Sequence, residues 1–263
     1  MSYAESFCNH DTAGLARQAR NRNVARVNAP AGPTCAATPN ISIVIPTLNE
    51  TAELPETLRR ARAIPEVCEI IVVDGGSHDA TCQLAAESGC TVLTAPAGRG
   101  GQLRLGASRA RGEIVLLLHA DTWLPPEAGR AALACCRHPA VVGGGFWKVF
   151  RDPAWLMYGA RARCGLRLWL GGRILGDQAI FIRREVLDRI GGVPDVPLME
   201  DVELCRRMRR VGRLALADAT VVTSTRRFRK LGVLRTYWRM WTVGVRYRLG
   251  TTPEELRRLY EKE

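Results

Sequence analysis

The chain has 263 residues, of which 46% are hydrophobic and 24% are charged, a balance typical of a globular protein rather than a disordered or fibrous one. A formal net charge of +12 favours anionic partners such as nucleotides, nucleic acid or an anionic membrane surface, without choosing among them. No apolar run reaches the roughly 18 residues of a membrane span, no signal-peptide pattern opens the chain, and the scattered cysteines contain no C-x-x-C pair, so we expect a cytoplasmic protein with reduced thiols.

Residues 1–39 lack hydrophobic periodicity and are rich in arginine, alanine, asparagine and proline. We expect a mostly disordered extension there, with an arginine-rich presequence as the alternative. From residue 40 to residue 263 we expect one domain, because no linker interrupts the pattern. Short apolar runs predict strands at 41–45, 69–74, 91–94 and 113–118, and the segments between them predict helices at 54–61, 79–88 and 102–111. This alternation predicts an α/β fold with a mostly parallel central sheet and helices on both faces.

The second half is less regular. Its pattern predicts strands at 141–150, 177–183 and 214–222, and helices at 155–169 and 202–211. A basic helical tail follows over about 231–263, in which apolar residues recur at helical spacing: Leu234, Trp238, Trp241, Val245 and Leu249. Two interpretations of this stripe stay open. It either lies in an anionic membrane interface or packs against the core, as most amphipathic helices do.

Two acidic residues stand at the carboxyl ends of predicted strands. Asp74 follows Ile-Ile-Val-Val, and Asp121 closely follows a second apolar run. In open parallel sheets ligands bind outside the carboxyl ends of the strands, so the two carboxylates are expected to face one crevice. A helix cap or turn residue is the alternative for either acid alone, and finding both at one edge favours a binding site.

Two glycine-containing segments come shortly after predicted strands. Gly75 and Gly76 permit a tight turn beside a ligand, although the segment does not match the G-x-G-x-x-G dinucleotide pattern. Gly98-Arg-Gly-Gly-Gln102 suggests a phosphate loop but lacks its Lys-Ser/Thr ending, which excludes a P-loop ATPase.

Four short motifs, in order and at suitable spacing, carry a family resemblance. They are Val-Ile-Pro-Thr-Leu-Asn-Glu (44–50), Val-Val-Asp-Gly-Gly-Ser-His-Asp-Ala-Thr (72–81), Leu-His-Ala-Asp-Thr (118–122) and Met-Glu-Asp-Val-Glu-Leu (199–204). With them, the chain from Ile41 onward resembles the family 2 glycosyltransferases, whose GT-A fold is a Rossmann-like sandwich. The glycine-rich stretch and the segments 176–183 and 197–201 resemble a bacterial subgroup, some of whose members are associated with arsenosugar biosynthesis.

The resemblance implies a nucleotide site built from residues in several loops. The implied nucleotide-binding residues are Pro46, Thr47, Asn49, Glu50, Asp74, Gly75, Arg99, Gln102, Ala120 and Asp121. Asp74 would hydrogen-bond the base, and Asp121 would bind Mg²⁺ or Mn²⁺ as the last acid of a D-x-D signature. His119 replaces the first acid of that signature, and its role as a phosphate contact, a metal ligand or a packing residue stays open.

The resemblance also implies a catalytic base. Glu200-Asp201 matches an E-D motif in which Asp201 would be the base, whereas the residues alone would equally allow a helix cap. The diphosphate or acceptor side would hold Glu200, Gln178, Arg226 and Arg227. Solvated surface is the alternative for the two arginines, and a satisfied buried amide is the alternative for Gln178.

Together these features predict transfer of a sugar from a nucleoside-diphosphate sugar to an acceptor hydroxyl, with inversion and a divalent metal. The acceptor is not identified and is either soluble or lipid-linked. With a lipid-linked acceptor we expect a weak membrane contact and a peripheral position on the inner face of the membrane. A nucleotidyltransferase would carry a glycine-rich loop with lysine after the first strand, and a nucleic-acid-binding protein would carry a recognisable module. Neither is present, so we expect no nucleic-acid partner.

Overall fold

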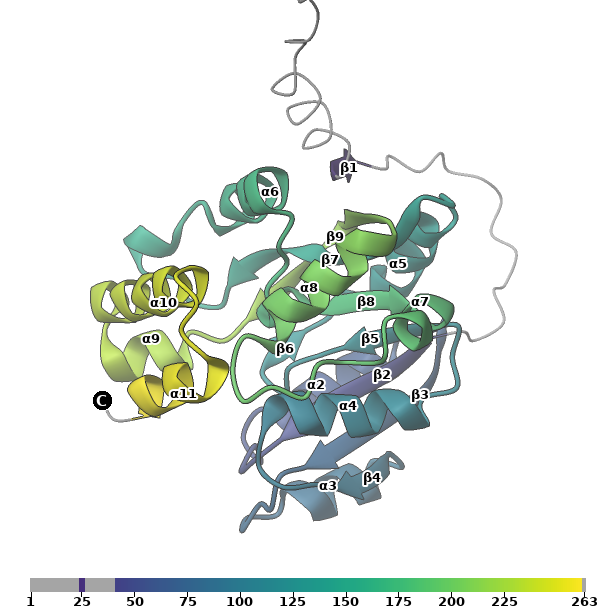
Figure 1. The fold of residues 1–263 in the computed structure, drawn as a ribbon. Helices are drawn as coiled ribbons and strands as arrows, with labels where there is room; N and C mark the ends of the chain where they lie inside the picture. Colours follow the sequence, from purple (N-terminus) through teal and green to yellow (C-terminus); the bar gives the residue numbers. More distant parts are fainter. Residues whose placement is uncertain (1–23, 27–40, 262–263) are drawn as a thin grey trace, which may run out of the picture.

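The computed structural model describes residues 24–26 and 41–261, which form a nine-stranded sheet flanked by helices (Figure 1). The main path of the sheet runs β1-β9-β7-β8-β5-β2-β3-β4, and β6 pairs with β9 outside this path. The strands are β1 (Val24–Arg26), β2 (Ile41–Thr47), β3 (Val67–Asp74), β4 (Thr91–Thr94), β5 (Ile114–Leu117), β6 (Thr122–Trp123), β7 (Val141–Phe150), β8 (Ile180–Arg183) and β9 (Arg213–Thr223).

The sheet is mixed, which corrects the expectation of a mostly parallel one. Strands β2, β3, β4 and β5 are parallel to one another, and β1, β7 and β9 form a second parallel group. Strand β8 lies between the groups and is antiparallel to both β5 and β7, and β6 is antiparallel to β9. Because helices cover both faces, strands of either direction are continuous apolar runs, and hydrophobic pattern alone does not reveal direction.

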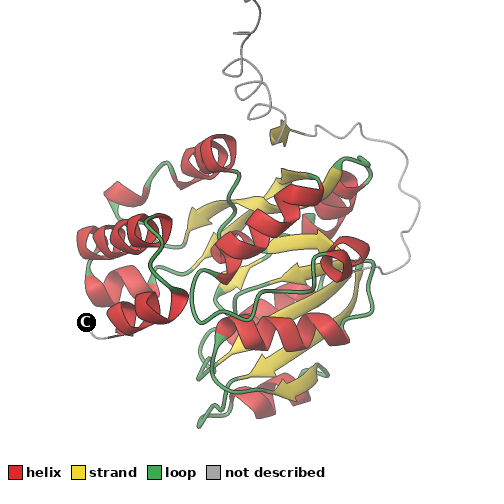
Figure 2. Ribbon diagram, in the orientation of Figure 1, coloured by secondary structure: helices red, strands yellow, loops and turns green. Residues whose placement is uncertain are grey.

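Helices pack on both faces of the sheet, as Figure 2 shows. One face is covered by α2 (Leu54–Arg62), α3 (Thr81–Glu87) and α5 (Ala128–Cys136), whose buried residues join those of the strands in one hydrophobic core. The other face is covered by α4 (Arg99–Arg109), α6 (Ala160–Gly171), α7 (Arg184–Arg189) and α8 (Glu200–Val211), which complete a second core. Alternate residues of β2 enter opposite cores: Ile43 and Ile45 the first, Val44 the second.

Three C-terminal helices form a separate group at one end of the sheet, drawn in yellow-green and yellow in Figure 1. They are α9 (Arg226–Leu231), α10 (Val233–Arg248) and α11 (Pro253–Glu261). A small apolar cluster holds them to the domain, in which the Phe228 ring lies 5.2 Å from the rings of both Phe150 and Tyr237. The tail is therefore part of the folded domain.

Two sequence predictions need correction, and a third falls mostly outside the described residues. The helix expected over 155–169 is interrupted: a 3₁₀ turn, Trp155–Met157, is followed by Gly159 in the left-handed conformation, and α6 begins only after it. The strand expected over 177–183 begins at Ile180, because Gly176–Gln178 forms a second 3₁₀ turn. Val24–Arg26, inside the segment expected to be disordered, pairs with β9, and the rest of residues 1–39 lies outside the described residues.

Four of the five residues of the apolar stripe of the tail face outward, so the interpretation in which the stripe packs on the core is wrong for them, whereas Val245 is half-buried. Leu234, Trp238, Trp241 and Leu249 are 72%, 65%, 59% and 80% exposed. The helix instead turns Val233 and Tyr237 toward the domain, where they pack on the small apolar cluster. Among the described helices, none combines the length and the apolar character that a bilayer span requires.

Candidate active site

Strand direction brings several chain segments to one edge of the sheet. The parallel strands β2, β3 and β5 end there, and β8 begins there because Ile180 pairs with Leu117 at the end of β5. β7 is antiparallel to β8 and parallel to β9, so both end at the same edge, at Phe150 and Thr223. The segments after β3 and β5 therefore meet at one edge, as expected, but of the two acids expected to face one crevice only Asp121 lines the cavity described next.

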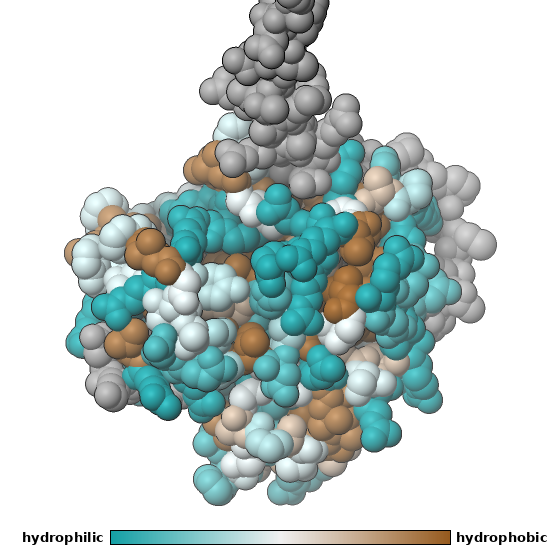
Figure 3. All heavy atoms as spheres, in the orientation of Figure 1, coloured by the Kyte–Doolittle hydropathy of each residue, from teal (hydrophilic) through white to brown (hydrophobic). Residues whose placement is uncertain are grey.

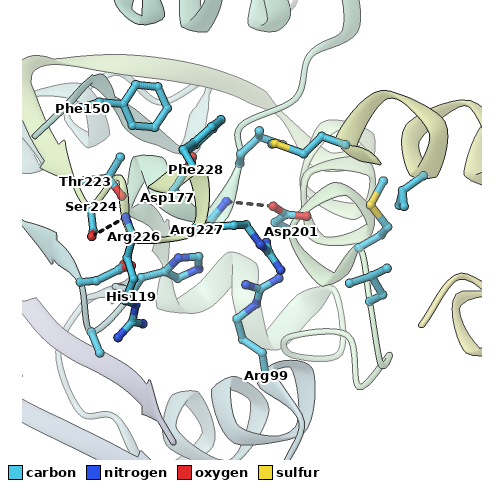
Figure 4. A pocket seen from close by; sticks show the side chains of 18 of the residues that line it. Arg99, His119, Phe150, Asp177, Asp201, Thr223, Ser224, Arg226, Arg227 and Phe228 are labelled. Carbon is cyan, nitrogen blue, oxygen red and sulfur yellow. Dashed lines mark hydrogen bonds between the residues drawn. The ribbon is translucent and has the colours of Figure 1, made fainter. Parts of the chain in front are cut away.

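A cavity of about 770 Å³ lies at this edge, and its wall includes residues from α8, α9 and α10. Eight of the residues expected from the sequence line it: Pro46, Glu50, Arg99, Ala120, Asp121, Asp201, Arg226 and Arg227. The other seven expected residues do not line it: Thr47, Asn49, Asp74, Gly75, Gln102, Gln178 and Glu200. Figure 4 shows side chains from distant parts of the chain pointing into this space, among them Arg99, His119 and Asp201.

Asp74 organises the loop in which it lies. Its Oδ2 accepts hydrogen bonds from the backbone N–H groups of Gly76 and Ser77, and its Oδ1 accepts from the hydroxyls of Thr47 and Ser77. Burial raises the pKa of Asp74, but these hydrogen bonds outweigh burial and leave the pKa below its ordinary value. The role of Asp74 in contacting a base stays a prediction, because all four bonds are made within the protein.

Gln102 has a similar structural role. Its side-chain amide donates to the carbonyl oxygens of Thr47 and Val73, at 2.9 and 2.7 Å, and so ties α4 to the ends of β2 and β3. The loop after β2 is held in turn by the loop after β3, because Asn49 Oδ1 accepts the His78 N–H and the Glu50 N–H donates to Thr81. Expected nucleotide residues that miss the cavity thus shape the backbone beneath it.

Asp201 lies at the first turn of α8 and faces the cavity. Its Oδ2 accepts the N–H of Gly176 at 2.9 Å (Figure 4). Burial and the neighbouring Glu200 carboxylate raise the pKa of Asp201 to about 6, against the opposing effect of the Arg99 guanidinium. A carboxylate with a raised pKa, held in a cavity, is suited to accept a proton near neutral pH.

Glu200 points away from the cavity and is almost fully buried. Arg99, at the start of α4, donates to its carboxylate in a close ion pair. Gly100 makes this approach possible, because a Cβ atom at that position would lie 2.5 Å from the carbonyl oxygen of Val196. Glu200 therefore anchors Arg99 beside Asp201 instead of lining the cavity itself.

Asp121 presents an open carboxylate to the cavity. No described residue donates a hydrogen bond to it, and burial raises its pKa, as do the nearby Glu50 and Asp177, although Arg226 lowers it. No three His, Cys, Asp or Glu side chains cluster as a metal cage within the part of the chain that the structure describes. Asp121 offers one oxygen ligand, which fits a Mg²⁺ or Mn²⁺ ion that takes its remaining ligands from a diphosphate and water.

His119 stands next to Asp121 and against Gly176. A Cβ atom at residue 176 would lie 2.5 Å from His119 Nε2, so only glycine fits there. Burial and the Arg99 guanidinium lower the pKa of His119 to about 4, which keeps the imidazole neutral at physiological pH. A neutral ring remains able to accept a hydrogen bond or to bind a metal.

Arg226 forms a bidentate ion pair with Glu50, with N–O distances of 2.8 and 2.9 Å. The pair joins α9 to the loop after β2 across the cavity, and it holds one of the two arginines expected near the diphosphate. Gln178 is different: its amide donates to the Phe146 carbonyl and accepts from Arg167 and the Leu175 N–H. Gln178 is a satisfied buried amide, so its expected place on the acceptor side is not where the structure puts it.

Sequence reasoning gave no role to several charged residues of the cavity wall. Asp177, beside Gln178, forms an ion pair with Lys148 at 2.5 Å. Arg167 and Arg173 line the same wall. Asp177 lies in a motif that carried the family resemblance, which was the available signal, whereas the arginines stand in segments with no distinctive pattern.

Comparison with known families and proteins gives a consistent result. The model of the family described as Glycosyl transferase family 2 matches residues 42–191, more than half of the 263 residues. The undecaprenyl-phosphate 4-deoxy-4-formamido-L-arabinose transferase of Pseudomonas paraeruginosa is 34% identical over 133 residues, which are 46% of this chain and 39% of that protein. Its counterpart in Pseudomonas fluorescens (strain SBW25) is 41% identical over 99 residues, 33% of this chain and 29% of that protein. The chain thus covers less than half the length of these curated relatives.

Solved structures share the fold. The mannosyltransferase PcManGT of Pyrobaculum calidifontis, in complex with GDP-Man and Mn2+, has a TM-score of 0.60 at 19% identity, covering 91% of this chain and 72% of that one. Glucosyl-3-phosphoglycerate synthase of Mycobacterium tuberculosis, in complex with Mn2+, UDP and glucosyl-3-phosphoglycerate, has a TM-score of 0.50 at 23% identity, covering 70% of each chain.

Proposed function

Because the chain belongs to glycosyl transferase family 2, we propose that its cavity binds a nucleoside-diphosphate sugar and transfers the sugar, with inversion, to an acceptor hydroxyl. The observation that carries the proposal is the Asp201 carboxylate, whose pKa is raised to about 6 and which faces a cavity of about 770 Å³ shared with Asp121, Arg226 and Arg227. Relatives named as transferases and the fold shared with sugar transferases support it.

The proposed step is a single displacement at the anomeric carbon. The acceptor oxygen forms a bond to that carbon while its proton passes to Asp201, and the bond from the carbon to the diphosphate oxygen breaks. The electron pair of the broken bond leaves with the nucleoside diphosphate. Asp201 is oriented for this role by the Gly176 N–H, and the Arg99 guanidinium offsets part of the rise that Glu200 causes in the pKa of Asp201.

The departing diphosphate needs positive charge. Arg226 and Arg227 line the cavity on the side of Asp121, and arginine forks match phosphate oxygens. Asp121 would hold a divalent ion, with the neutral His119 next to it, and a bound ion would neutralise charge that develops on the leaving group. The Mn2+ in both structural neighbours supports a divalent metal and does not choose between Mg²⁺ and Mn²⁺.

Two observations support a lipid-linked acceptor. Relatives whose names specify undecaprenyl phosphate support a lipid-linked acceptor, and the exposed apolar stripe of α10 supports contact with a membrane surface. In the view of Figure 3, apolar residues are scattered among polar ones over the C-terminal helices. A role in arsenosugar biosynthesis remains a prediction from the sequence resemblance alone.

The Asp201→Asn variant tests the proposal. It should bind the nucleoside diphosphate as the wild type does and lose about 10² to 10⁴ in transfer rate, the usual contribution of a positioned base. Release of nucleoside diphosphate from UDP-, GDP- and dTDP-sugars with Mg²⁺ or Mn²⁺ gives the rate, and calorimetry gives the binding. Asp195→Asn, an exposed carboxylate of the loop before α8, is the control. Transfer by Asp201→Asn within threefold of the wild-type rate would contradict the role of the base.

A further inference from the structure

A second cavity, of about 360 Å³, opens beside the first one between α6 and α10. The two share part of their walls, including Arg167, Arg173 and Asp177. The residues proposed to hold the donor, Asp121, Arg226 and Arg227, line the first cavity only. The exposed Trp241 borders the second cavity at the surface. The second cavity therefore leads from the proposed reaction centre to the aromatic face of α10.

The charge of this second cavity is strongly unbalanced. Its ionisable wall residues are five bases and one acid: Lys148, Arg163, Arg167, Arg173, Arg248 and Asp177. Asp177 is already paired with Lys148, and Arg163 donates to the carbonyl oxygens of Met157 and Tyr158. The acid and two of the bases thus have partners within the protein, and three arginines remain.

These three arginines are under-used as hydrogen-bond donors. Arg173 is half-buried and makes no hydrogen bond or ion pair with any described residue, and the same holds for Arg248. Arg167 donates to the Gln178 side chain and to the Cys164 sulfur, while its buried Nε has no partner among the described residues. Burial lowers the pKa of Arg173, and the guanidinium groups of Arg248, Arg167 and Arg209 lower it further. Arg248 is exposed at the rim of the cavity, whereas Arg173 and Arg167 are half-buried, and the wall offers these cations no carboxylate other than Asp177, which Lys148 already binds. Because like charges held together away from water are costly, an anion bound among them would be stabilising.

We propose that the guanidinium groups of Arg167, Arg173 and Arg248 bind a phosphate group of the acceptor in the cavity between α6 and α10. The inference rests on the proposed transferase function and adds the chemical class of its acceptor, a phosphate ester. Arginine forks match phosphate oxygens in geometry and charge. Arg173 lies three residues before Gly176, whose N–H holds Asp201, so a phosphate bound here would direct the rest of the acceptor toward the base.

The test uses the full chain saturated with nucleoside diphosphate and Mn²⁺, so that the donor side is filled. Calorimetry follows the binding of glycerol 3-phosphate, and co-sedimentation follows phosphatidylcholine vesicles that contain phosphatidylglycerol, whose headgroup carries both a phosphate and hydroxyl groups. Arg173→Gln should weaken binding at least tenfold, Arg173→Lys should recover part of the loss, and Arg130→Gln, at an exposed position of α5, should stay within twofold of wild type. Arg248→Gln, at an exposed helix end, replaces Arg173→Gln should that variant not fold.

The two binding measurements distinguish a soluble phosphate ester from a phosphate carried by a lipid. Arginine-dependent binding of glycerol 3-phosphate identifies a soluble phosphate ester, and arginine-dependent binding of the vesicles alone identifies a lipid phosphate. Equal binding of both probes by the wild type and by Arg173→Gln, or binding of neither probe by a wild type that binds the nucleoside diphosphate, overturns the inference. Failure of the nucleoside diphosphate to bind overturns the proposed function instead.

Discussion

At the scale of single residues, several groups of the site lower the stability of the folded protein. Asp201 is held in a setting that disfavours its charged form, with Glu200 next to it in the chain. Met199, immediately before α8, has a positive φ of 66°, a conformation that costs a non-glycine residue roughly 1–2 kcal/mol. Both features act on the turn that places Asp201 at the cavity wall. Strain and unfavourable burial at one turn are expected where function rather than stability fixes the geometry.

The raised pKa of Asp201 predicts the pH dependence of transfer. A base works only when deprotonated, so kcat/KM should rise with pH through an inflection near 6, the value to which burial and Glu200 raise this pKa. Glu200→Gln should move the inflection to lower pH because it removes a repelling charge. The rate of nucleoside diphosphate release between pH 5 and 8 measures this, and a flat profile would contradict it.

The same shift has a consequence for stability. Because folding favours the protonated form of Asp201, its stabilising contribution is complete below about pH 4 and is lost as pH rises through the folded pKa of about 6. Asp201→Asn should therefore raise the melting temperature at pH 8 and leave it unchanged at pH 4, while Asp195→Asn changes neither. One pKa unit corresponds to ~1.4 kcal/mol, so the gain should be at most a few kcal/mol.

Asp121 and Asp74 are expected to respond differently to mutation. Asp121→Ala should weaken only the metal-dependent part of nucleotide binding, because no described residue donates a hydrogen bond to its carboxylate. Asp74→Ala should weaken binding with and without metal and also lower the melting temperature, because it removes four hydrogen bonds from the loop after β3. Calorimetry with and without Mg²⁺, beside thermal melts, separates the two. Equal losses in both conditions for both variants would rule out the division of roles.

At the scale of secondary-structure elements, helix α10 shows that a sequence pattern can identify an apolar helical face without showing whether that face packs on the core. The stripe of Trp238 and Trp241 is a genuine helical face, but the face that packs inward lies one position away, at Val233 and Tyr237. The inward face contains a tyrosine and a cavity-lining glycine, Gly244, so its sequence is less apolar than that of the outward face. Periodicity identifies an apolar face, and tertiary contacts decide which face is buried.

The exposed stripe predicts binding to anionic membranes. Trp238 and Trp241 stack at 5.1 Å on the surface of α10 among arginines, an arrangement suited to the headgroup region. Full-length protein should co-sediment with anionic vesicles at low salt, and the bound fraction should fall as salt rises. Trp238→Ala with Trp241→Ala should abolish binding without changing the melting temperature, whereas Val211→Ala, an exposed apolar residue of α8, should not. Wild-type protein that ignores anionic vesicles at low salt would contradict the membrane contact.

At the scale of the whole molecule, the sequence predicted the fold class and the edge at which the site lies, since both follow from apolar runs and the acids after them. It did not reveal the antiparallel β8, whose four residues are as apolar as a parallel strand. Nor did it separate residues that line the cavity from those that support it. The side chains of Asp74 and Gln102 could bind a nucleotide and lie at suitable positions in the chain, but they are hydrogen-bonded to nearby backbone groups instead. That distinction depends on contacts between segments far apart in sequence.

Because the net charge is +12, the protein is expected to bind many polyanions, and a test must separate this general binding from specific binding of a nucleotide. A specific site differs from a diffuse one in its response to salt. Non-specific binding to nucleic acid releases counterions and weakens steeply as salt rises, whereas binding of a nucleotide in a cavity together with a metal depends on salt much less. A nucleoside diphosphate with Mn²⁺ at about 100 times its Kd should stabilise the protein by ~2.7 kcal/mol, or roughly 5–10 °C in melting temperature for a chain of this size.

We expect this shift in melting temperature to persist from low to physiological salt and to shrink in Asp121→Ala, while a shift caused by duplex DNA disappears over the same range of salt. A DNA-induced shift that survives physiological salt, with none from any nucleoside diphosphate, would favour the nucleic-acid-binding alternative over the transferase.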